Sequence, residues 1–88
     1  MSTLHVINKA NALPACLSVA GAHDALLLIE DGVYAGTKGR SPSRPLYALA
    51  ADVSARGLTE RLGISVTVIS DAEFVQLAVD HQPIVSWR

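Results

Sequence analysis

A chain of 88 residues, half of them hydrophobic and 17% charged, predicts a single domain over residues 1–88 and excludes a disordered segment. Seven basic and eight acidic residues give a net charge of −1, which excludes the strongly basic surface typical of nucleic-acid or anionic-lipid binding. One cysteine excludes an internal disulfide. No apolar run reaches about 18 residues, and MSTLHVIN lacks a signal-peptide pattern. We therefore expect a cytoplasmic protein without a membrane partner.

Five short apolar segments predict β-strands. The segment ALLLIE is a continuous apolar run, which is typical of a strand buried on both faces. The segments between them are long enough for helices, and this alternation favours an α/β domain with a mainly parallel sheet of four or five strands. The predicted strands are TLHVI (3–7), ALLLIE (25–30), PLYALA (45–50), SVTVIS (65–70) and PIVSW (83–87).

The first helix is predicted to begin near Asn11, a good N-cap residue, with Pro14 in its first turn and Gly21 as its end. A short helix follows the third strand in ADVSARG and is closed by Gly57.

The last helix has the clearest boundaries. Ser70 and Glu73 form the pattern of a capping box, and Pro83 forbids continuation beyond VQLAVDHQ. Between the second and third strands, TKGRSPSR reads as a mobile, solvated loop. Lys38, Arg40 and Arg44 in this loop are expected to be solvated. The alternative interpretation is that they contact phosphate on a partner's ligand.

The only cysteine, Cys16, has two opposed interpretations. Leu13, Cys16, Leu17 and Ala20 fall on one helical stripe, which favours a buried sulfur. Cys16 also lies near the predicted helix start, where the helix dipole lowers the pKa of a thiol and favours the reactive thiolate. The residues alone leave both interpretations open.

Other site chemistries have little support. The predicted strand ends carry Asp31, Asp52 and Asp71, whose charges repel phosphate, and no Walker-type or G-x-G-x-x-G pattern offsets them. The segment DGVYAGTKG is therefore expected to be a turn followed by a short helical or irregular segment.

Neither a metal site nor a serine nucleophile is indicated. His5, His23 and His81 lie far apart in the chain with no ligand partner at metal-binding spacing, so no metal is expected. No G-x-S-x-G elbow supports a serine hydrolase.

Five segments in order, LHVIN, LLLIEDGVYA, LYALAADVSARGL, ISDAEFVQLAVDH and a terminal W, together resemble the DsrH/TusB family of sulfur-relay proteins. The patterns D-G-V-Y-A and D-x-x-A-R-G-L are the most specific. The resemblance spans nearly the whole chain and implies a DsrE-like three-layer α/β/α domain.

The resemblance also implies a function. It implies a subunit that helps pass persulfide sulfur toward 2-thiolation of the wobble uridine of tRNA. The alternatives are a DsrEFH-like sulfur carrier in dissimilatory sulfur oxidation and a non-catalytic scaffold subunit of the relay hexamer.

The resemblance implies partners as well. They are TusC/TusD-like (DsrF/DsrE-like) subunits in a heterohexamer, a TusA-like donor, and a TusE/DsrC-like acceptor reached through the complex. No cofactor, metal or direct tRNA contact is implied.

The same resemblance bears on the role of Cys16. DsrH-type members carry a cysteine followed by leucine fifteen residues before the D-G pair, and Cys16-Leu17 stands fifteen residues before Asp31-Gly32. TusB-type members typically lack this cysteine. The resemblance therefore makes Cys16 the candidate catalytic residue, as the persulfide carrier of a sulfurtransferase subunit.

Overall fold

The computed structural model describes residues 2–88, and all five predicted strands are present. They are β1 (Leu4–Ile7), β2 (Ala25–Leu28), β3 (Leu46–Leu49), β4 (Val66–Ile69) and β5 (Ile84–Trp87). All pairs are parallel, and the strand order is β4-β3-β2-β1-β5. The predicted α/β class with a parallel sheet is therefore confirmed.

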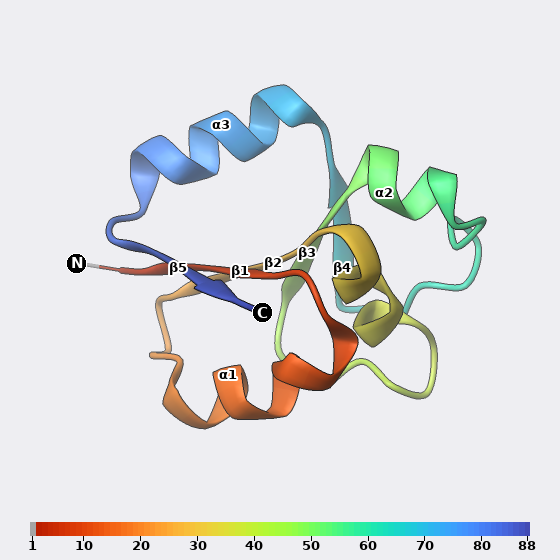
Figure 1. Cartoon of the computed structure of the whole chain (residues 1–88), viewed down its shortest axis with the longest axis horizontal. Coiled ribbons are helices and arrows are strands. Elements are labelled where there is room, and N and C mark those ends of the chain that lie inside the picture. Colours follow the sequence, from red (N-terminus) through yellow and green to blue (C-terminus); the bar gives the residue numbers. More distant parts are fainter. Residues whose placement is uncertain (1) are drawn as a thin grey trace.

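Helices cover both faces of this sheet. The α-helices are α1 (Leu13–Val19), α2 (Ala50–Ala55) and α3 (Asp71–Asp80), and the 3₁₀ helices are η1 (Ala10–Ala12) and η2 (Glu30–Gly36). The chain steps from β1 to β4 one strand at a time and then returns across the sheet to β5. Because such connections are right-handed, the reversal places α3 on the face opposite α1, as Figure 1 shows.

The last helix begins as the sequence predicts. The backbone N–H of Glu73 donates to the Ser70 hydroxyl at 3.2 Å, and the N–H of Ser70 donates to the Glu73 carboxylate at 2.9 Å. This reciprocal pair is the predicted capping box, and α3 ends at Asp80, before Pro83. Gly57 also closes α2 as predicted, because its φ of +66° is the left-handed conformation that glycine favours.

The predicted role of Asn11 as the N-cap of the first helix was wrong. Asn11 lies within η1, α1 begins at Leu13, and the capping position at Ala12 makes no side-chain hydrogen bond. Pro14 does occupy the first turn of α1. The sequence pattern favoured a capped α-helix at this position. The structure instead has the tight turn of η1, which packs against η2.

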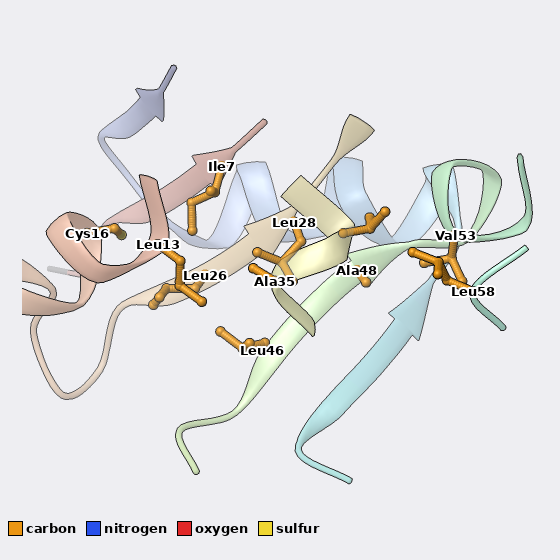
Figure 2. Packing of buried hydrophobic residues seen from close by; sticks show 11 residues of the cluster. Ile7, Leu13, Cys16, Leu26, Leu28, Ala35, Leu46, Ala48, Val53 and Leu58 are labelled. Atoms are coloured by element: carbon orange, nitrogen blue, oxygen red, sulfur yellow. The ribbon is translucent and has the colours of Figure 1, made fainter. Parts of the chain in front are cut away.

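Two clusters of apolar side chains hold the layers together. The α1-side core, drawn in Figure 2, contains Ile7, Leu13, Cys16, Leu26, Leu28, Val33, Ala35, Leu46, Ala48, Val53 and Leu58. The α3-side core contains Leu4, Val6, Ala25, Leu27 and Ile69, with side chains of α3 packed against it. Every residue of β1 and β2 is buried, as expected for central strands of a parallel sheet.

Across residues 2–88, the structure contains no helix that is long and apolar enough to cross a membrane.

Candidate functional site

Cys16 is a core residue in this structure. It is the fourth residue of α1, its exposed fraction is 0%, and its side chain points from α1 toward the strands in Figure 2. Leu13 is buried beside it, and Leu17 and Ala20 are partly buried against the same core. The apolar stripe predicted for this helix therefore faces inward.

Burial raises the pKa of the Cys16 thiol from 9.0 to about 11. The positive charge of Arg44 acts in the opposite direction but is smaller than the cost of burying the thiolate, and the charge of Asp24 adds to the increase. Of the two interpretations that the sequence left open, the structure favours the buried sulfur, because desolvation of the thiolate is the largest influence on this pKa. The thiol of Cys16 is therefore almost entirely protonated at neutral pH.

A partly buried hydrogen-bonded triad joins Asp24, in the turn at the amino end of β2, to His5 of β1 and to Trp87, the last residue of β5. His5, in the middle of β1, is 5% exposed. Its Nε2 lies 2.9 Å from Asp24 Oδ2, and the indole Nε1–H of Trp87 donates to its Nδ1 at 3.0 Å. A carboxylate only accepts, so Nε2 carries the proton and Nδ1 is the acceptor. Both ring nitrogens of His5 are therefore engaged in hydrogen bonds.

Asp24 is the hub of this arrangement. Its carboxylate accepts from the backbone N–H of Thr3 at 2.9 Å, from His5, and from the backbone N–H of Gly21 at 2.8 Å. These hydrogen bonds, led by that from Thr3, hold the pKa of Asp24 well below its ordinary value. Asp24 therefore remains an anion that orders the turn before β2.

Arg44 is a structural residue, which corrects the prediction that the whole segment TKGRSPSR is a solvated loop. Its guanidinium donates to the carbonyl oxygens of Gly21 and Asp24. Lys38 and Arg40, in contrast, have exposed side chains as predicted. The end of this segment thus clamps the turn that carries Asp24.

At the opposite end of the sheet, Arg56 links two of the predicted acidic strand ends. Its Nε lies 3.0 Å from Asp31 Oδ1, and its Nη1 lies 3.8 Å from Asp52 Oδ1. Asp52 also accepts from the backbone N–H of Glu30 at 2.8 Å. Asp71 instead is the first residue of α3. Sequence reasoning missed the role of Arg56, although this arginine belongs to the D-x-x-A-R-G-L pattern.

Surface hollows of about 220 to 630 Å³ lie on the described part of the chain, and Cys16 does not line these hollows. One, of about 250 Å³, brings together His23 and His81, which the sequence separates widely, with Asp24, Arg44 and Tyr47. Within residues 2–88, no three His, Cys, Asp or Glu side chains are grouped closely enough to hold a metal ion.

Comparisons with known proteins give one consistent result. A family model described as "DsrH: DsrH like protein" matches residues 8–84. The chain is similar to Protein TusB of Pectobacterium carotovorum subsp. carotovorum (strain PC1), at 44% identity over 73% of this chain and 75% of that protein. It is similar to Protein TusB of Serratia proteamaculans (strain 568), at 42% identity over 85% of this chain and 86% of that protein.

A third relative extends the similarity over nearly the full length. Protein TusB of Escherichia coli (strain SMS-3-5 / SECEC) is 35% identical over 99% of both chains. Among solved structures, the ychN protein of E. coli matches with a TM-score of 0.67 over 99% of this chain and 100% of that chain. Its sequence identity is 15%, so this last match bears on the fold alone.

Proposed function

The chain belongs to the DsrH family of sulfur-relay subunits, and we propose that it serves in a relay that delivers persulfide sulfur for 2-thiolation of the wobble uridine of tRNA. The observation that supports this assignment is the match to proteins named TusB, at 35% to 44% identity over most of the chain. The proposed partners are TusC/TusD-like subunits in a heterohexamer, with a TusA-like donor and a TusE/DsrC-like acceptor.

Within that relay we propose a scaffold role for this chain. A sulfur carrier needs a thiolate that meets donor and acceptor in turn. The thiol of Cys16 is fully buried, and this burial raises its pKa to about 11. These observations support a persulfide carried on a partner's cysteine. The experiment below also tests the opposite hypothesis, that Cys16 itself carries the persulfide.

A gene-replacement experiment tests both statements. Deleting the gene in the source bacterium should abolish 2-thiouridine in tRNA, as measured by mass spectrometry of nucleosides, and the wild-type gene should restore it. Thiolation that persists after deletion, together with a loss of sulfur oxidation, would favour the alternative DsrEFH-like pathway.

The same deletion strain tests the role of Cys16. The Cys16→Ala variant should restore thiolation like the wild type, because a scaffold needs no sulfur. A variant that joins the complex normally but leaves the tRNA unthiolated would instead establish Cys16 as a carrier. Mass spectrometry of the purified wild-type complex after exposure to a persulfide donor adds an independent reading, since only a carrier gains the mass of a sulfur atom.

A further inference from the structure

The hydrogen bond between Trp87 and His5 ties the end of the chain to its first strand. β5 lies at one edge of the sheet and pairs with β1 alone. Its residues Ile84 and Val85 are 50% and 37% exposed, and Ser86 is exposed as well. Trp87 is the partly buried side chain of this strand and packs against the α1-side core. The side-chain anchoring of β5 therefore depends mainly on Trp87.

The two ring nitrogens of His5 respond differently to an added proton. The Nε2–H donates to Asp24 both in the neutral ring and in the imidazolium, so that bond survives protonation. The Nδ1 accepts from the Trp87 indole only while it carries no proton. An imidazolium would place two N–H donors 3.0 Å apart, and this contact is repulsive. A proton on His5 thus acts on Trp87 selectively.

Several charged or titratable groups surround His5. The carboxylate of Asp24 contacts the ring directly. Arg44 donates to the Asp24 carbonyl, and Cys16 is neutral because burial raises its pKa to about 11. His23 lines the adjoining hollow with Asp24 and Arg44, as does His81 after α3.

We propose that the His5–Trp87 contact is a proton-operated latch: uptake of a proton at His5 Nδ1 releases Trp87 and loosens the edge strand β5, while the His5–Asp24 pair remains in place. Backbone bonds that flank the strand, Leu4 N–H to Pro83 O at 3.1 Å and Asn8 N–H to Trp87 O at 3.2 Å, limit the release to local opening. The latch concerns this chain by itself and does not depend on the relay function.

The chain has one tryptophan, so its indole N–H gives a single resonance in a ¹⁵N-labelled sample. Between about pH 8 and pH 5, the range in which histidines commonly titrate, this resonance should shift toward a solvent-exposed value. The hydrogen-exchange protection of β5 amides, corrected for intrinsic exchange rates, should fall roughly tenfold or more, whereas protection in β2 should hold.

Two variants make the test decisive. Trp87→Phe keeps an aromatic ring but removes the donor, so its β5 protection should be low at both pH values and independent of pH. The double variant His23→Asn/His81→Asn should keep the wild-type response, because the Trp87 indole donates to His5 and to neither of these residues. An unchanged indole resonance in the wild type, a pH response that survives in Trp87→Phe, or one that disappears in the double variant would each overturn the latch.

Discussion

The guanidinium of Arg44 donates to the carbonyl oxygen of Asp24 at 2.9 Å, and so a cation at the end of the basic loop holds the turn that precedes β2. The same guanidinium donates to the carbonyl oxygen of Gly21. These bonds connect the segment before β3 to the segment before β2, which are neighbouring strands.

Replacing Arg44 should therefore destabilise the protein. Arg44→Ala removes two hydrogen bonds from a charged donor, and we expect a loss of about 1–3 kcal/mol in the free energy of unfolding. Arg40→Ala, at an exposed position of the same loop, is the matched control and should change stability by less than about 0.5 kcal/mol. Urea unfolding measures both. Equal effects of the two substitutions would contradict the clamp.

The burial of Cys16 makes a second prediction. Cys16→Ser places a hydroxyl in the α1-side core with no partner, and the free energy of unfolding should fall by about 1–3 kcal/mol. Ser18→Ala, on the exposed side of the same helix, should be nearly neutral. Thermal melts followed by circular dichroism compare the two variants with the wild type. A Ser variant as stable as the wild type would indicate that the sulfur is accessible.

The raised pKa of Cys16 predicts how stability depends on alkaline pH. Folding favours the protonated thiol, so this contribution is complete below the ordinary value of 9.0 and is lost as pH rises from 9.0 toward about 11. A difference of about two pH units corresponds to at most roughly 3 kcal/mol. Because lysines and tyrosines also titrate in this range, the measurement is the difference between wild type and Cys16→Ala in urea unfolding at several pH values. Parallel curves would show that the thiol is not desolvated.

The lowered pKa of Asp24 predicts the opposite dependence in acid. The carboxylate is the form that the folded state favours, so its contribution is present above the ordinary value of 3.8 and is lost as pH falls below that value. The Asp24→Asn variant should be less stable than the wild type at neutral pH, and the difference should shrink in acid. If the difference in stability between Asp24→Asn and the wild type did not depend on pH, the loss would come from altered geometry and not from the charge of Asp24.

Replacing Gly32 is expected to have the largest effect on stability. A Cβ at this position would lie 2.0 Å from the carbonyl oxygen of Ile7, so η2 and the end of β1 approach each other too closely for any side chain. Gly32→Ala should cost at least about 2–3 kcal/mol or prevent folding, because backbone atoms would have to move. Gly21→Ala is the control, since its nearest contacts would be at an ordinary 3.5 Å. The expression yield and the melting temperature of the two variants measure this difference.

Local patterns in the sequence were sufficient for most of the architecture. Apolar runs specify the strands because a strand in a parallel sheet is buried on both faces. The spacing of Ser70 and Glu73 specifies the start of α3 because a capping box requires only residues within one turn. The stripe through Leu13 and Cys16 likewise indicates which side of α1 packs inward.

Tertiary structure alone decided the chemistry around these elements. Trp87 and His5 are 82 positions apart, and only the placement of β5 beside β1 brings them together. The pKa of Cys16 depends on how completely the core excludes water, and the sequence therefore left both directions of its shift open. Arg44 carries the same charge as its exposed neighbour Arg40, and its role as a clamp follows from carbonyl oxygens that a distant turn presents to it. Periodicity and capping are local properties of the chain, whereas desolvation and long-range hydrogen bonds exist only after the layers have packed.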